Sequence, residues 1–286
     1  MRILVLGAGQ IGAAVLKAAP SGHEVIVRTH AQLDIVDARA AGQALAEIKA
    51  DWVVNAAAYT AVDRAEDEPA AALAVNDTAV AKLAQAASCE KARLLHLSTD
   101  FVFDGTAGRP YRPTDATHPL NVYGATKRAG ELHVLEGGSG IVMRTSWVYA
   151  SVGKNFVLTM LKLMEERDRL NVVCDQIGTP TWAMSAAAAI WALIELGPRG
   201  GIYHWSDLGV ASWYDFAVAI QEEAHARGLL TRTASIVPIP SAAYAARATR
   251  PSFSVLDTSA ARAMLRLPGQ HWREALRSML DELRAA

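Results

Sequence analysis

The sequence has very little cysteine. Its 286 residues include only Cys89 and Cys174, and neither lies in a CxxC or Cys/His metal-ligand pattern. The eight histidines are scattered, with no HxxxH or HExxH spacing. We therefore predict no disulfide framework and no catalytic metal, and we expect both cysteines to be reduced residues of the core.

Long apolar runs and an excess of one charge are also lacking. Even the alanine-rich stretch 185–196 is shorter than the roughly 18 apolar residues that a membrane helix needs. With 28 basic and 29 acidic residues the formal net charge is −1, which gives no general attraction to nucleic acid or anionic lipid. Glycines interrupt the apolar amino-terminal segment, so it does not match the pattern of a signal peptide well. We expect a cytoplasmic protein with neither a membrane nor a nucleic-acid partner.

A glycine-rich turn follows the first apolar segment, Ile3–Leu6. Glycines in a GxGxxG turn between a strand and a helix let the backbone approach a pyrophosphate, which the free amides at the helix start then bind. The sequence therefore predicts a dinucleotide site, to which the turn contributes Gly7, Gly9, Gln10, Ile11 and Gly12.

The ends of the next two strands refine this site. Strand 24–27 ends in Arg28 and Thr29 rather than in an acidic residue, which favours the 2′-phosphate of NADPH, with NADH still possible. Asp34, beside Ile35, could reach the adenine amino group or cap the helix 38–49. Strand 52–55 is followed by Ala56, Ala57, Ala58 and Tyr59, whose small side chains would let a cofactor lie close to the backbone.

Strand and helix signals alternate through residues 1–150, which predicts an α/β fold with a doubly wound, Rossmann-like parallel sheet. One helix is expected over the alanine-rich run 70–87, where Asn76 is either a satisfied core amide or a group that positions water. After residue 150 the alternation weakens. We expect 151–286 to form a smaller, mostly helical substrate domain, with segments of about 171–205 returning to the sheet.

Tyr123 and Lys127 lie four residues apart in the predicted helix 121–131, so they share one helix face. Such pairs are common on solvated helices. Here, however, the preceding buried strand 94–97 ends in hydroxyl groups at the sheet edge where ligands bind. Lowering a tyrosine pKa from about 10 to neutrality requires roughly 4 kcal/mol, and a fixed lysine is a plausible source of it.

Several motifs together resemble the extended short-chain dehydrogenase/reductase superfamily and, within it, the dTDP-4-dehydrorhamnose reductases. They comprise 7–12, 33–35, 55–63, 98–105, 119–124, 144–149, 175–181 and 250–251, and they cover nearly the whole chain. The resemblance implies NAD(P)H-dependent reduction of the C4 ketone of dTDP-4-dehydro-6-deoxy-L-mannose to dTDP-L-rhamnose.

The resemblance also implies roles for individual residues. Tyr123 would protonate the forming alkoxide, Lys127 would lower the tyrosine pKa and bind the nicotinamide ribose, and Thr99 would hydrogen-bond the carbonyl oxygen. Ser98 would lie at the cofactor. The residues expected to face the dTDP-sugar are Asp100, Phe101, Trp147, Asn155, Gln176, Thr181 and Arg250. Arg144 and Arg250 are candidates to bind the diphosphate, and both could instead form structural ion pairs.

Two features depart from the family pattern. The glycine loop is one residue shorter than GxxGxxG, and Ala13-Ala14-Val15 lacks the acidic residues that bridge some dimers through magnesium. A monomer or a homodimer therefore stays open. One alternative is another nucleotide-sugar reductase, epimerase or 4,6-dehydratase. Thr99-Asp100-Phe101 disfavours the dehydratase, because it lacks the Asp-Glu pair that dehydratases commonly have next to the threonine. The other alternative is a non-catalytic NADP-binding regulatory subunit.

Overall fold

The computed structural model describes residues 1–285, and its centre is a six-stranded sheet in which every strand pair is parallel. Its strands are β1 (Arg2–Leu6), β2 (Glu24–Arg28), β3 (Trp52–Asn55), β4 (Arg93–Thr99), β5 (Ile141–Thr145) and β10 (Gly201–His204). In the strand order β10-β5-β4-β3-β1-β2, β2 lies on one side of β1 and the later strands lie on the other side, so the order of addition switches between β1 and β3. This confirms the predicted Rossmann-like fold, in which ligands bind at such a switch point.

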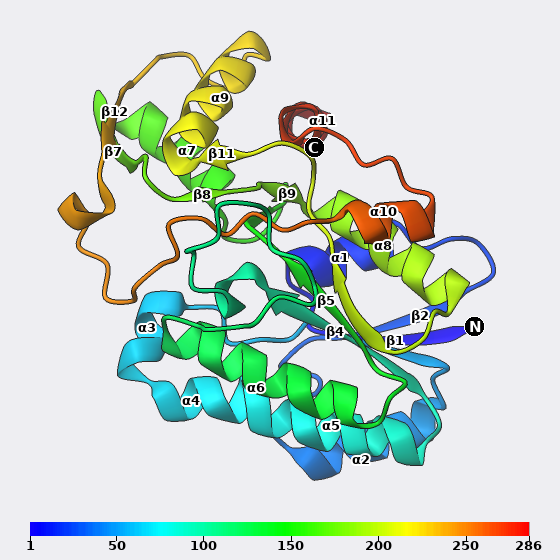
Figure 1. Cartoon of the computed structure of the whole chain (residues 1–286). Helices are drawn as coiled ribbons and strands as arrows, with labels where there is room; N and C mark the ends of the chain where they lie inside the picture. Colours follow the sequence, from blue (N-terminus) through cyan, green and yellow to red (C-terminus); the bar gives the residue numbers. More distant parts are fainter. Residues whose placement is uncertain (286) are drawn as a thin grey trace.

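Helices cover both faces of the sheet (Figure 1). In β1, Ile3 and Val5 join one core with α1 (Gln10–Lys17) and α8 (Ala183–Leu196), with α10 (Ser259–Leu265) beside them. The alternate residues Leu4 and Leu6 join a second core with α2 (Ala38–Ile48), α5 (Ala79–Cys89) and α6 (Val122–Glu136). A strand buried on both faces reads as an unbroken apolar run, as β1 does.

The helix predicted over 70–87 is present, but a π-helical turn interrupts its regular α-helical geometry. The chain forms α3 (Val62–Asp67), then α4 (Pro69–Leu73), a π-helical turn η1 (Ala74–Thr78) and α5. The π turn carries Asn76, whose side-chain oxygen accepts from the Tyr59 amide at 2.9 Å and whose nitrogen donates to the Tyr59 carbonyl at 3.1 Å. Asn76 is therefore a satisfied amide that holds the loop after β3.

A smaller lobe forms the upper left of Figure 1. It contains α7 (Phe156–Glu166), β7 (Arg169–Val173), α9 (Trp213–Ala226) and β12 (Ser235–Ile239), whose apolar residues pack with α11 (Trp272–Ala285). Because β7 pairs with β12, this part of the segment predicted to return to the sheet stays in the smaller lobe. The later part, α8 and β10, does return.

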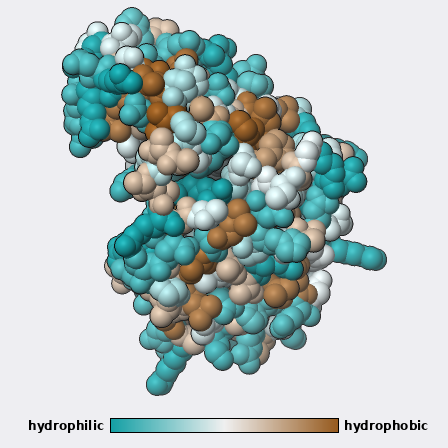
Figure 2. Space-filling model, turned by 60° about the vertical axis from the view of Figure 1, so that its left-hand side comes forward, coloured by the Kyte–Doolittle hydropathy of each residue, from teal (hydrophilic) through white to brown (hydrophobic). Residues whose placement is uncertain are grey.

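Two-residue ladders lie between the lobes. β6 (Val148–Tyr149) pairs with β9 (Thr181–Trp182), and β8 (Ile177–Gly178) pairs with β11 (Ala211–Ser212). The chain also forms two short 3-10 turns, η2 (Asp100–Val102) directly after β4 and η3 (Ser241–Ala243) shortly after β12. The space-filling view shows a waist between the two lobes (Figure 2).

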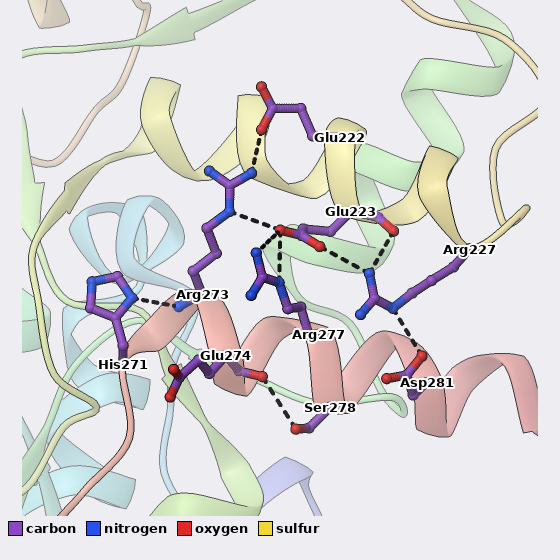
Figure 3. Close-up of polar contacts among 9 residues, drawn as sticks. All are labelled: Glu222, Glu223, Arg227, His271, Arg273, Glu274, Arg277, Ser278 and Asp281. Atoms are coloured by element: carbon purple, nitrogen blue, oxygen red, sulfur yellow. Dashed lines mark hydrogen bonds and ion pairs between the residues drawn. The ribbon is translucent and has the colours of Figure 1, made fainter.

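Ion pairs fasten α9 to α11 across the smaller lobe (Figure 3). At their centre Glu223 accepts hydrogen bonds from Arg227, Arg273 and Arg277. Burial raises the pKa of Glu223, but the three arginines outweigh burial and lower it. Glu223 is therefore an ionised structural group.

The prediction that both cysteines are core residues is wrong. Cys89 is exposed at the end of α5 and Cys174 is partly exposed, and both are free thiols. Across residues 1–285, no helix has the length and apolarity to cross a bilayer.

Candidate active site

A cavity of about 880 Å³ opens at the switch point of the sheet. It receives the ends of β1, β3 and β4, the start of α6 and the loop after β5, so it joins segments far apart in the sequence. Seventeen of the predicted site residues line it: Gly7, Gly9, Gln10, Ile11, Thr29, Asp34, Ile35, Ala56, Ala57, Ala58, Tyr59, Ser98, Thr99, Asp100, Tyr123, Lys127 and Trp147. Its size suits a dinucleotide-sized ligand.

The glycine turn forms the floor of one end of the cavity. The Gly7 amide donates to the Arg28 carbonyl at 2.9 Å, which ties the turn to β2. A Cβ on Gly12 would lie 1.9 Å from the Gly7 carbonyl oxygen, so only glycine permits this approach of helix to turn. No side chain caps the start of α1, which leaves its first amides for an anion. These features fit a dinucleotide pyrophosphate.

The opposite wall of this end is formed by the residues after β2. Thr29, His30 and Asp34 line the cavity, whereas Arg28 does not. Asp34 is exposed, accepts from the Val36 amide in its own turn and lies 3.6 Å from His30 Nδ1. The cap of α2 is Asp37, which accepts from two amides at 3.0 Å. Capping by Asp34 is therefore wrong, while its contact with adenine stays a prediction.

Tyr123 is placed by the first turn of α6. Asn121 caps this helix by accepting from the Gly124 amide at 2.7 Å. A Cβ on Gly124 would lie 2.2 Å from the Phe101 carbonyl oxygen, so glycine lets α6 approach η2 closely. The Phe101 ring then packs edge-on against Tyr123, with 5.9 Å between centroids. Burial raises the pKa of Tyr123 to about 12, the Thr99 hydroxyl lowers it in part, and the charge of Asp100 adds to the rise.

Lys127 contacts β4 rather than Tyr123 in this structure, and its predicted effect on the tyrosine pKa stays a prediction. Its Nζ donates to the Leu97 carbonyl at 2.6 Å and lies 3.0 Å from His96 Nε2. Burial lowers the pKa of Lys127 to about 8, with Glu131 opposing the change, and Lys127 is not among the groups that shift the Tyr123 pKa. The shared helix face is confirmed, but the lysine is turned toward β4.

Thr99 and Asp100 form a buried hydroxyl–carboxyl pair at the end of β4. The Thr99 hydroxyl donates to Asp100 at 3.1 Å and accepts from the Phe101 amide at 3.2 Å. Ser254 also donates to Asp100. Burial raises the pKa of Asp100 to about 6 against the opposing effect of these two hydroxyls. Thr99 must therefore turn its hydrogen from Asp100 before it can donate to a substrate.

Ser98 and Arg144 both bind the buried carboxylate of Glu131. Ser98 donates at 2.6 Å, and Arg144 donates two bonds of 2.7 Å. Arg144 is 1% exposed and does not line the cavity. Of the two interpretations left open for Arg144, the structural ion pair is confirmed, so it is not placed to bind a diphosphate.

Trp147 lines the cavity from the loop after β5. Its backbone has a φ of +46°, which is uncommon for a bulky residue. The indole stacks on Trp213 at 3.6 Å with 5° between the planes. Gln176 lies behind this pair, accepting from Trp213 Nε1 at 3.2 Å and donating to Ser241 at 2.9 Å. Gln176 thus contacts the wall of the cavity rather than its interior.

Three other predicted substrate residues have structural partners outside the cavity lining. Asn155 caps α7, accepting from Leu158 at 3.1 Å. Thr181 is fully buried and donates to the Thr179 carbonyl at 3.4 Å. Arg250 forms a two-bond pair with Asp63 at 2.7 and 3.1 Å. Their contacts with a substrate stay predictions, as do those of Phe101.

Several lining residues escaped the sequence-based prediction. Thr145 lies opposite Thr99 in the β4–β5 register, and its buried hydroxyl has no partner among the described residues. Lys154 lies on the loop before α7, where its carbonyl accepts from Gln10. The rule that placed Thr99 at a strand end would also have selected Thr145, whereas no local signal selects Lys154. In residues 1–285 no group of three His, Cys, Asp or Glu is arranged to hold a metal ion.

A doubly wound sheet with a glycine turn at its switch point, and with a threonine, a tyrosine and a lysine in the same cavity, defines an extended short-chain dehydrogenase/reductase fold. The chain belongs to the family described as RmlD substrate binding domain, whose model matches residues 1–285.

Individual relatives agree with this family. The chain is 41% identical to a dTDP-4-dehydrorhamnose reductase of Burkholderia thailandensis, over 96% of this chain and 97% of the relative. It is 39% identical to that of Escherichia coli K12, over 99% and 98%. A crystal structure of the Bacillus anthracis reductase in complex with NADP superposes with a TM-score of 0.93 at 33% identity, covering 98% of this chain and 99% of the other.

Proposed function

We propose that this protein is an oxidoreductase that reduces the C4 ketone of dTDP-4-dehydro-6-deoxy-L-mannose to dTDP-L-rhamnose with NAD(P)H. The observation that carries the proposal is that Thr99, Tyr123 and Lys127 share one cavity with the glycine turn of Gly7–Gly12. The names of the relatives, dTDP-4-dehydrorhamnose reductases at about 40% identity over nearly the whole chain, support the same reaction. The bound cofactor supplies the hydride.

The residues of the chain then act on the developing alkoxide. Tyr123 donates its phenolic proton, and its pKa of about 12 keeps that proton in place before reaction. Thr99 hydrogen-bonds the same oxygen once its hydroxyl leaves Asp100, which stabilises charge as it forms. Lys127 binds the nicotinamide ribose and, as an ammonium, lowers the cost of leaving Tyr123 deprotonated.

NADPH is the proposed cofactor, with NADH as a possible substitute. The end of β2 carries Thr29 and His30 in the cavity wall and no carboxylate next to the strand, an arrangement that accepts a 2′-phosphate. The NADP in the Bacillus anthracis relative supports this preference.

We also propose that 1–150 bind the dinucleotide and that 151–286, apart from α8 and β10, bind mainly the sugar nucleotide. Trp147 and Asp100 line the cavity between these parts and are the proposed contacts of the sugar. Gln176, Thr181 and Asn155 would support this wall from behind. Arg250 would meet the diphosphate only by leaving Asp63. A cytoplasmic monomer or homodimer is the proposed form.

The test is a spectrophotometric assay of NADPH and NADH oxidation with dTDP- and UDP-linked 4-keto sugars. We expect turnover with the dTDP sugar, faster with NADPH. Tyr123→Phe should lower kcat by about 10²- to 10⁴-fold and leave the Kd for NADPH within about 2-fold. The matched control is Tyr203→Phe, because Tyr203 lies on β10 and donates to Arg199 away from the cavity. Tight NADPH binding without turnover of any 4-keto sugar would favour the regulatory alternative.

A further inference from the structure

A chain of buried hydrogen bonds runs from Asn55 at the end of β3 through His96 on β4 to Lys127. The Ala57 amide donates to Asn55 Oδ1 at 3.2 Å, and Asn55 Nδ2 lies 3.1 Å from His96 Nδ1. His96 Nε2 lies 3.0 Å from Lys127 Nζ, which donates to the Leu97 carbonyl at 2.6 Å. Asn55 and His96 are fully buried and Lys127 is 2% exposed.

The directions of these hydrogen bonds are fixed from one end. A backbone amide only donates, so the side-chain atom of Asn55 facing Ala57 is its oxygen, and the atom facing His96 is its NH₂ group. His96 Nδ1 must then accept, which puts the proton of the neutral ring on Nε2. An N–H at Nε2 needs an acceptor, and the hydrogen-bonding group found beside it within residues 1–285 is Lys127 Nζ. An ammonium has no lone pair to accept with, whereas a neutral amine has one.

Protonating the ring instead does not resolve the conflict. A proton on Nδ1 would face the NH₂ group of Asn55. Burial, together with the charge of Lys127, holds the pKa of His96 well below its usual range. The neutral Nε2–H form of His96 is therefore the one that suits its surroundings.

The other charged groups near Lys127 do not supply it with a free counter-ion. Glu131, one turn further along α6, is the carboxylate that favours the ammonium. It already accepts from Arg144, Arg128 and Ser98. Tyr123 faces the cavity from α6 with a raised pKa, and Asp100 at η2 is held by Thr99 and Ser254.

We propose that Asn55 and His96 are positioning residues that hold Lys127 as a neutral amine in the free protein at alkaline pH, and that this amine takes up one proton from water when NADPH binds. An ammonium no longer accepts from His96, so its three hydrogens can serve the Leu97 carbonyl and ribose hydroxyls. The inference rests on the proposed function, because it takes the ligand of this cavity to be NADPH.

Calorimetric titration with NADPH at pH 9, in buffers of different ionisation enthalpy, counts the protons taken up on binding. At this pH the 2′-phosphate is already dianionic, because its second pKa is about 6. With Lys127 at a pKa of about 8 in the free protein, binding should take up about 0.9 proton at pH 9 and little at pH 6.5. Binding without uptake at pH 9 overturns the inference and leaves the proposed function intact. Failure to bind either cofactor overturns the proposed function.

Asn55→Asp tests the direction of the chain. A carboxylate accepts from both Ala57 and His96 Nδ1–H, so the ring proton leaves Nε2 and Nε2 accepts from a Lys127 ammonium. Proton uptake at pH 9 should fall below about 0.2. His204→Gln is the control, because His204 is equally buried on β10 without contacting Lys127, and its uptake should match wild type. Unchanged uptake in Asn55→Asp overturns the inference.

A measurement on the wild type covers the case in which Asn55→Asp does not fold. Nitrogen NMR of histidine-labelled free protein identifies the protonated ring atom of His96. At pH 9, where Lys127 is mostly neutral, we expect the Nε2–H form. The Nδ1–H form would allow Lys127 to be an ammonium and would overturn the inference.

Discussion

Two glutamates lie buried among arginines in different parts of the molecule. Glu131, beneath the candidate active site, is fully buried and accepts two bonds from Arg144, whose side chain is 1% exposed. Glu223, between α9 and α11, has a side chain that is 9% exposed (Figure 3). Its partners are Arg227, Arg273 and Arg277, whose side chains are 16%, 37% and 49% exposed.

The difference lies in what happens to the partner when one ion is removed. An arginine of the Glu223 cluster can turn into water, so it keeps most of its hydration. Glu131 cannot leave the protein interior, and losing Arg144 leaves much of its charge uncompensated. The glutamate–arginine pair is thus a partly hydrated contact between two helices in the smaller lobe and a fully buried ion pair beneath the candidate active site in the other lobe.

Arg144→Met would break the deeper pair and should have the largest effect. We expect the free energy of unfolding to fall by about 3–5 kcal/mol, because the buried carboxylate of Glu131 loses its buried arginine and keeps only Arg128 and Ser98 as partners. Urea denaturation followed by circular dichroism measures this. The control is Arg128→Met, which removes a partner of Glu131 that is 27% exposed and should cost less than about 1 kcal/mol. Equal losses would contradict the contrast drawn between exposed and buried partners.

Lys127→Met sharpens the comparison by removing a buried cation that has no free counter-ion. The folded pKa of Lys127 is about 8, below the 10.5 of a solvated lysine, so between these pH values the unfolded chain binds more protons. Stability of the wild type therefore rises with pH across this window. Relative to Lys127→Met it should gain about 3 kcal/mol between pH 7 and 10.5.

Denaturation of both proteins at pH 7, 8.5 and 10.5 measures this difference. Lys162→Met is the control for the loss of a lysine, because Lys162 is exposed on α7. A pH-independent difference for Lys127→Met would show that the folded protein holds an ammonium throughout.

Glu223→Gln breaks the shallower cluster with the shape of the side chain kept. We expect a loss of about 1–2 kcal/mol of unfolding free energy, since the three arginines can be hydrated. The Kd for NADPH, measured by fluorescence titration, should stay within 2-fold because the cluster lies outside the cavity lining. A changed Kd would mean that the packing of α9 on α11 extends its influence to the cofactor.

Lys154→Met concerns an exposed cation and should have the smallest effect. Lys154 lines the cavity next to Gln10, near the free amides of α1, so it is placed to meet the cofactor phosphates. We expect the Kd for NADPH to rise about 3- to 5-fold, which corresponds to less than about 1 kcal/mol, with the unfolding free energy unchanged. Lys162→Met should leave the Kd unchanged. No effect of Lys154→Met would place the phosphates away from this loop.

The sequence predicted the parts of the fold that local pattern controls. Apolar runs such as Ile3–Leu6 alternate with helix signals. In the turn between the first strand and helix, Gly7 and Gly12 need their small size, because a Cβ there would lie 2.8 and 1.9 Å from backbone atoms. These features placed the sheet, its switch point and most of the residues that line the cavity.

The partners of long polar side chains were not predictable in this way. Tyr123 and Lys127 share a helix face, but only the fold brings His96 to Lys127, and only the fold joins Arg144 to Glu131 across α6 and β5. A buried arginine and a ligand-binding arginine have the same sequence signature. Asn155 shows the same limit, because a helix cap and a substrate contact both call for a short amide.

The π turn at Ala74–Thr78 has a consequence for changes in chain length. Such a turn contains one residue more than the regular helix around it. Deleting one residue there would restore an ordinary helix from Pro69 to Cys89, yet it would rotate Asn76 by about 100° around the helix axis and detach it from Tyr59. Length variation is therefore tolerated at this helix only where it preserves the phase of a single asparagine.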